Sequence, residues 1–165
     1  MTRRVSAGIL LYRQRDGGLE VLLGHPGGPF FTNRDLGNWT IPKGEPGPED
    51  TLEAAATREF QEETGHALGA VARDPGTPLL DLGSVLQASG KRVHCWAVEG
   101  DLDPATAVSN TFEMAWPPGS DRIGTFAEID RVAWFGIDEA RRRANPSQAT
   151  FVDRLVTVLS ADRSG

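Results

Sequence analysis

The sequence predicts one domain, residues 1–165, that mixes strands and helices and belongs to the α/β or α+β class. A length of 165 residues suits a single domain with a real core, and neither an internal repeat nor a linker interrupts it. The apolar fraction of 39% and the charged fraction of 24% are typical of a globular protein. Segments with the composition of strands alternate with segments of helical periodicity, and this mixture indicates the class.

The N-terminal part is expected to form a hairpin, a long loop and a helix. Residues 4–13 and 19–24 are rich in β-branched and apolar residues, and the turn signal DGG separates them. The Gly- and Pro-rich residues 25–39 form a loop of a length that is often functional, although a plain surface excursion is the alternative. A short strand at 39–41 and a loop at 42–48 then lead to a helix at 51–64, with Asp50 as its N-cap.

The C-terminal part is expected to add more strands and two helices. Residues 81–89 and 91–100 form a second hairpin, and residues 112–116 and 131–135 form shorter strands. Residues 138–143 and 147–160 have helical patterns, and Ser147 is a plausible N-cap for the second of these helices.

Charge and cysteine content exclude several classes of function. The net charge is −6 and no basic face is apparent, so binding to a nucleic-acid polymer is not expected. The single cysteine excludes an intrachain disulfide and a zinc site of several thiolates. No apolar run approaches the roughly 20 residues of a membrane span, and the N-terminus has the pattern of a strand rather than of a signal peptide. A cytoplasmic protein, either monomer or homodimer, is therefore expected.

Three glutamates crowd the end of the helix expected at residues 51–64. At about 100° per residue, Glu59, Glu62 and Glu63 share one face with Leu52, Ala55 and Ala56. Like charges at these spacings disfavour a helix by about 0.2–0.5 kcal/mol per pair, and acids in the last turn oppose the helix dipole. A divalent cation, Mg²⁺ or Mn²⁺, would offset both effects, because such ions take carboxylate and phosphate oxygens. The alternative is a solvated acidic helix end with no ion.

The spacing around these glutamates resembles the signature of the Nudix hydrolase family. That signature has a glycine, five residues, a glutamate, seven residues, and then R-E-U-x-E-E-x-G-U, where U is bulky and apolar. Residues 44–66 match it with Gly44, then Asp50 in place of the first glutamate, then REFQEETG and His66 in the last apolar position. Asp50 is one methylene shorter than glutamate, so its ion pair with Arg58 is expected to be weaker. Several segments also resemble a bacterial subgroup described as predicted NTP pyrophosphohydrolases, which is similar in parts to diadenosine polyphosphate hydrolases.

The resemblance implies an α/β/α sandwich with a mixed curved sheet, in which a loop–helix–loop holds divalent cations against a diphosphate. It implies that Glu59, Glu62 and Glu63 are metal ligands and that one of these glutamates, or its bound water, acts as the base. The carbonyl of Lys43, the residue before Gly44, is a further candidate ligand.

The resemblance also implies a glutamate from outside this motif, shortly before a strand that contains tryptophan. Glu128 fits that place in the segment EIDRVAW, and an exposed loop acid is the alternative. Glu113 is a weaker rival for the same role. Arg58 is expected to orient the carboxylates of the helix.

The implied reaction is metal-dependent hydrolysis of a phosphoanhydride in a nucleoside diphosphate linked to another group, so the expected partner is a small nucleotide. Candidates for stacking on the base are Phe30, Phe31 and Trp39. Candidates for phosphate contacts are Arg34, Lys43, Lys91 and Arg92. Structural roles are expected for His25, His94 and Cys95. Two alternatives remain, a nucleotide-binding or regulatory module of the same fold without turnover, and an acidic site that only buffers or binds cations.

Overall fold

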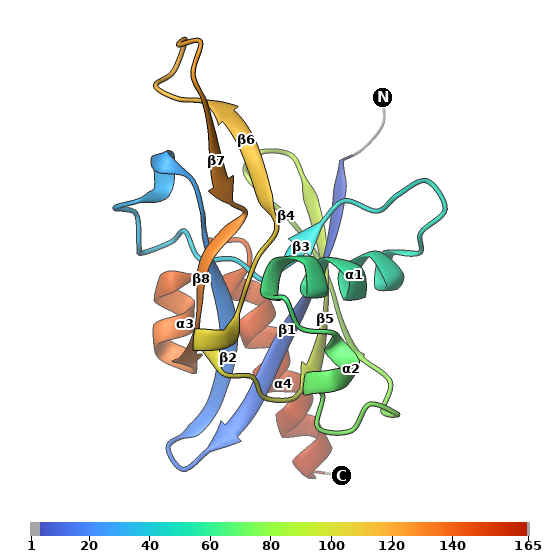
Figure 1. Ribbon diagram of the computed structural model, residues 1–165. Helices are drawn as coiled ribbons and strands as arrows, with labels where there is room; N and C mark the ends of the chain where they lie inside the picture. The colour runs from blue at the N-terminus through green and yellow to red at the C-terminus, as the bar shows by residue number, and fades with distance from the viewer. Residues whose placement is uncertain (1–3, 165) are drawn as a thin grey trace.

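A mixed sheet forms the centre of the computed structural model, which describes residues 4–164 (Figure 1). Its six strands are β1 Val5–Arg15, β2 Gly18–Pro26, β3 Lys43–Gly44, β4 Leu80–Leu86, β5 Arg92–Glu99 and β8 Ile129–Gly136. The strand order is β4-β5-β1-β2-β8, and β3 pairs with the start of β1. Strands β1 and β5 run parallel while the other pairs are antiparallel, so the expectation of a mixed sheet is confirmed.

Helices cover both faces of the sheet. They are α1 Leu52–Thr64, α2 Leu68–Val71, α3 Ile137–Arg143 and α4 Ala149–Ser164, and the 3₁₀ turns are η1 Pro29–Phe31 and η2 Pro104–Thr106. One buried cluster packs α1 and α2 against one face, and a second packs α3 and α4 against the other. This arrangement is the expected α/β/α sandwich (Figure 1). No helix among the described residues is both long and apolar enough to cross a membrane.

A second sheet of two strands stands apart from the main one. Strands β6 Thr111–Ala115 and β7 Ile123–Ala127 form an antiparallel hairpin that projects beyond the sandwich (Figure 1). The sequence predicted only the first of these strands. The second was missed because its glycine and its length of only five residues weaken the strand pattern.

Helix α1 has the expected bounds but a different N-cap. Thr51 caps it, since the Thr51 side chain accepts a hydrogen bond of 3.1 Å from the Ala54 N–H. The prediction of Asp50 as N-cap was wrong, because the Asp50 carboxylate is engaged by Arg58 instead. Gly65 ends the helix in the left-handed conformation at φ 78°, as expected of a C-terminal glycine.

Two other expected elements differ from the structure, and one element was not expected. Residues 39–41 are no strand; Trp39 and Thr40 form isolated bridges, and the ladder with β1 begins only at Lys43. The last helix begins at Ala149 rather than at Ser147, whose hydroxyl bonds to Asn145 within the preceding turn. The short helix α2 was not predicted, because four residues are too few to show a helical period.

Candidate active site

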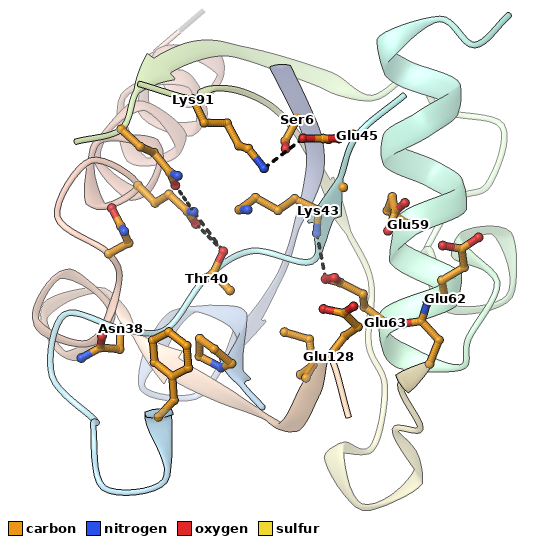
Figure 2. A pocket seen from close by; sticks show the side chains of 18 residues that line it. Ser6, Asn38, Thr40, Lys43, Glu45, Glu59, Glu62, Glu63, Lys91 and Glu128 are labelled. Carbon is orange, nitrogen blue, oxygen red and sulfur yellow. Dashed lines mark hydrogen bonds and ion pairs between the residues drawn. The ribbon is translucent and has the colours of Figure 1, made fainter. Parts of the chain in front are cut away.

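A cavity of about 580 Å³ lies beside the C-terminal half of α1. Its walls come from the start of β1, from β3 and α1, from the residue before β8 and from the connection between α3 and α4 (Figure 2). The pairing of the strands explains the opening. Strand β2 pairs with β1 only near the far end of β1, and the segment that contains β3 enters between the two strands.

Four carboxylates face this cavity on the α1 side, namely those of Glu59, Glu62, Glu63 and Glu128. Glu63 is buried, and its carboxylate accepts a hydrogen bond of 3.0 Å from the backbone N–H of Lys43. Burial raises the pKa of Glu63 from its ordinary value of 4.5 to about 8. Burial, and then the neighbouring Glu62, also raise the pKa of Glu59. A bound cation would relieve both the cost of burying these carboxylates and the repulsion between them.

Gly44 lets the Glu59 carboxylate approach the strand closely. A Cβ atom at position 44 would lie 2.1 Å from the carboxylate carbon of Glu59, which is far inside contact distance. Any side chain there would displace the carboxylate, so glycine at this position is required by the geometry of the site.

Arg58 ties the loop before α1 to the acidic wall. Its guanidinium forms an ion pair with Asp50, donates to the carbonyl of Glu45 at 3.1 Å and reaches the Glu59 carboxylate at 3.4 Å. Asp50 also accepts a hydrogen bond of 2.8 Å from the Gly47 N–H. Arg58 first, and then Gly47, lower the pKa of Asp50. The shorter acid therefore still makes the ion pair with Arg58 that the sequence had suggested would be weaker.

The backbone fixes Glu128 at the rim of the cavity. Its N–H donates to the carbonyl of Asn110 at 2.9 Å, and its carbonyl accepts from the Gly27 N–H at 3.0 Å. Asn110 in turn donates to the carbonyl of Glu62 at 2.8 Å, so this loop is fastened to the end of α1. The rival candidate, Glu113, lies exposed in β6 and is not among the residues that line the cavity.

The acidic side chains do not form a preassembled metal site. Within residues 4–164, no group of three or more His, Cys, Asp or Glu side chains is arranged to hold a metal ion. The donor set nevertheless fits a hard divalent cation, because four carboxylates lie on the α1 side of the cavity, one of them is buried, and Gly44 leaves space for another.

Two lysines occupy the opposite side of the cavity. Figure 2 shows the Lys43 side chain extending into it away from α1 and the Lys91 side chain entering it from the opposite side. Burial, and then the charge of Lys91, lower the pKa of Lys43. The ammonium of Lys91 forms an ion pair with Glu45 at 3.3 Å. Beside them, the buried hydroxyl of Ser6 has no hydrogen-bond partner among the described residues, and no sequence pattern had indicated it.

An amide group that the sequence did not single out organises the far end of the cavity. Gln148 is only 2% exposed. Its oxygen accepts from the Ile41 N–H at 2.9 Å, and its nitrogen donates at 2.9 Å to Thr40 and to Gln87. Only tertiary structure reveals this residue, because its partners come from two parts of the chain that are distant from it in sequence.

Of the three aromatic residues expected to stack on a base, one lies in the core and two lie at or near the surface. Trp39 is 2% exposed and packs against His25 and Phe135, so the expectation that it could stack on a ligand was wrong. Phe31 lines the cavity, and Phe30 next to it is 53% exposed.

The remaining polar candidates have structural contacts. His25 is buried between the Asp130 carboxylate at 2.9 Å and the Arg34 carbonyl at 2.6 Å. Arg34 and Arg92 do not line the cavity, and Cys95 is buried, where desolvation raises the pKa of its thiol. His94 stacks on Trp96 and contacts Asp81. These contacts agree with the structural roles expected for His25, His94 and Cys95.

A family model described as the NUDIX domain matches residues 2–155. The chain belongs to the NUDIX family. This finding confirms the resemblance inferred from residues 44–66 and extends it over nearly the whole chain. At the level of the family it also confirms the prediction of a pyrophosphohydrolase that acts on acid anhydrides.

Solved structures of other family members share the fold. An Ap4A hydrolase from C. elegans, in a binary complex, superposes with a TM-score of 0.64 at 19% identity, covering 94% of this chain and 98% of that one. The NUDIX domain of Shewanella oneidensis NrtR, complexed with ADP ribose, gives a TM-score of 0.64 at 16% identity, covering 96% and 90%. The Nudix hydrolase RenU from M. smegmatis gives 0.59 at 23% identity, covering 96% and 87%.

Proposed function

We propose that the protein hydrolyses a phosphoanhydride in a nucleoside diphosphate linked to another group, with Mg²⁺ or Mn²⁺ as cofactor. The observation that carries this proposal is the division of one cavity into an acidic wall on α1 and a basic wall with Lys43 and Lys91. Phosphates bound in this cavity need positive charge at both of its walls, and the lysine ammonium groups provide positive charge at one wall only. A divalent cation held by the carboxylates would provide positive charge at the other wall.

The residues proposed to hold the cation are Glu59, Glu62, Glu63 and Glu128, with the carbonyl of Lys43 as a further ligand. When bound, the cation would neutralise phosphate charge, polarise phosphorus and make water more acidic. Arg58 would keep the Glu59 carboxylate in place through its contact at 3.4 Å.

Proton transfer is assigned to a carboxylate of the acidic wall. In the reaction, a water oxygen forms a bond to phosphorus, the bond from phosphorus to the bridging oxygen breaks, and the water proton passes to the carboxylate. Burial raises the pKa of Glu59, which makes its carboxylate a better proton acceptor than an exposed one. Glu62 and Glu128 line the same cavity and are the alternatives for this role.

Two of the structurally similar proteins suggest the substrate class, since one is named an Ap4A hydrolase and the other is complexed with ADP ribose. We infer that this chain takes an NTP or a dinucleoside polyphosphate. Lys43 and Lys91 give the cavity a second charged wall, which suits a chain of several phosphates better than a single diphosphate.

A turnover assay tests the proposal. Purified protein is incubated with NTPs, dinucleoside polyphosphates, ADP-ribose and related nucleotide sugars, with Mg²⁺, with Mn²⁺ and with EDTA. Release of nucleotide that depends on the metal is expected for the first two groups. Metal binding without turnover of any compound would favour the alternative of a nucleotide-binding or regulatory module.

The variant Glu62→Gln is expected to lower turnover by about two to three orders of magnitude, because glutamine keeps the shape and removes the charge. Glu53→Gln is the matched control, since Glu53 is an exposed acid in the first turn of the same helix. Circular dichroism should show both variants folded. Full activity of Glu62→Gln would show that the assignment of this carboxylate is wrong.

A further inference from the structure

The β6–β7 hairpin rises from the rim of the catalytic cavity. The residues at its two ends, Asn110 and Glu128, both line the cavity and are joined by a hydrogen bond of 2.9 Å. The segment that contains η1 is hydrogen-bonded to the base of this hairpin, because the Gly27 N–H donates to the carbonyl of Glu128 at 3.0 Å. The hairpin and η1 therefore share a base beside the acidic wall.

One face of the hairpin is apolar and turned toward η1. Phe112 pairs with Phe126 across the two strands, and Met114 lies on the same face because side chains alternate along a strand. The ring of Phe112 approaches Gly28 so closely that a Cβ atom there would lie 3.0 Å from it. The ring of Trp116, which follows β6, meets the ring of Phe30 edge to face at 5.4 Å between centroids.

The cavity itself offers little surface on which a base could stack. Among the described residues that line it, Phe31 is the only aromatic one, and most of the others are charged or polar. Phe31 neighbours Phe30 in η1, so the aromatic end of the cavity continues into the contact between Phe30 and Trp116. The Phe30 side chain is 53% exposed.

We propose that η1 and the apolar face of the β6–β7 hairpin form a stacking site for the planar base of a nucleotide, with Phe30 and Trp116 as the residues that bind the base. The site continues directly from the cavity, and its few rings match the size of a base. A protein partner would need about 20–30 residues on each side. This inference rests on the proposed function, because it assumes that the phosphates of the same ligand lie in the cavity.

Ligands that contain no phosphoanhydride test the site without turnover. Binding of AMP, GMP, CMP and UMP is compared with binding of ribose 5-phosphate by calorimetry in the presence of Mg²⁺. These ligands share the sugar phosphate and differ only in the base. The wild type is expected to bind at least one of the nucleotides more tightly than ribose 5-phosphate.

The variants Phe30→Ala and Trp116→Ala should each raise the dissociation constant for that nucleotide by roughly 5- to 150-fold, the usual range for losing one stacking contact. Their affinity for ribose 5-phosphate should stay unchanged. Ile123→Ala is the matched control, because Ile123 lies 63% exposed on the opposite face of the hairpin and should leave both affinities unchanged.

Three results would overturn the inference. The first is a wild type that binds no nucleotide more tightly than ribose 5-phosphate. The second is unchanged nucleotide affinity in Phe30→Ala, an exposed position where folding is not at stake even if Trp116→Ala unfolds. The third is a dimer that dissociates on either substitution, since that would make the patch an interface between copies of the chain. Turnover that persists in the substrate panel would still support the proposed hydrolase, so the two ideas fail separately.

Discussion

Replacing Glu63 by glutamine is expected to stabilise the metal-free protein at alkaline pH. The Glu63 side chain is 8% exposed, and burial raises its pKa from 4.5 to about 8. The unfolded chain gives up this proton near its ordinary pKa, whereas the folded protein keeps it up to about pH 8. Between these values the folded state binds more protons, so its stability falls as pH rises. Glutamine keeps an oxygen that can accept the hydrogen bond from Lys43 and has no proton to lose.

The shift in pKa gives the magnitude of the effect. Linkage predicts that ionisation of Glu63 costs the wild type about 4 kcal/mol of unfolding free energy between about pH 5 and pH 9. For a chain of this length that cost corresponds to a fall of roughly 8–16 °C in melting temperature. The glutamine variant does not lose this free energy. The difference in unfolding free energy between the variant and the wild type should therefore grow across this pH range and level off above it.

Thermal and urea unfolding in EDTA at several pH values measure the difference in stability between the wild type and Glu63→Gln. Glu53→Gln is the control, because Glu53 lies exposed at the other end of α1. Adding Mg²⁺ at pH 9 should stabilise the wild type more than the glutamine variant, since a cation relieves the buried charge. Parallel loss of stability in the wild type and Glu63→Gln from pH 5 to pH 9 would refute the idea that this carboxylate is desolvated in the fold.

Three further substitutions test the site and its helix. Gly44→Ala should lower turnover by about tenfold or more while the fold persists, because the new methyl group displaces the Glu59 carboxylate; Gly17→Ala, with no atom within 4 Å of the added carbon, should leave turnover unchanged. Thr51→Ala removes the N-cap of α1 and should lower the unfolding free energy by about 1 kcal/mol in urea titrations. Arg58→Lys should reduce turnover by roughly 10- to 100-fold, since one ammonium cannot replace a guanidinium that orients the site. Unchanged kinetics in this variant would remove Arg58 from the positioning role.

The acidic helix shows how far the sequence could lead. Its bounds, its closing glycine and the shared face of its three glutamates follow from local spacing, and all three are present in the structure. The degree of burial was not predictable. Glu63 is 8% exposed while the side chain of Glu62 is 41% exposed, although the two are neighbours. The difference depends on β3, which packs over one side of the helix end and leaves the other open.

The cap of α1 shows a local rule overridden by a tertiary contact. Both Asp50 and Thr51 are good N-cap residues, and the sequence alone favoured Asp50. In the folded chain Arg58 forms an ion pair with the Asp50 carboxylate, and Thr51 is the residue that caps the helix. N-cap propensity alone cannot choose between two neighbouring residues such as Asp50 and Thr51. The choice depends on whether a charged side chain elsewhere in the fold, here Arg58, binds one of them.

The class of fold, the helix with its spaced carboxylates and the family all follow from the order of residues along the chain, because periodicity and short spacings are properties of contiguous residues. The folded chain adds to the cavity two groups that the sequence had not indicated, the buried hydroxyl of Ser6 and the amide of Gln148, and it brings them together with the proposed Glu128. Only the tertiary structure decided that η1 and β6–β7 face each other across an aromatic contact. These placements depend on how loops close and strands pair over long separations, and no local pattern of residues encodes them.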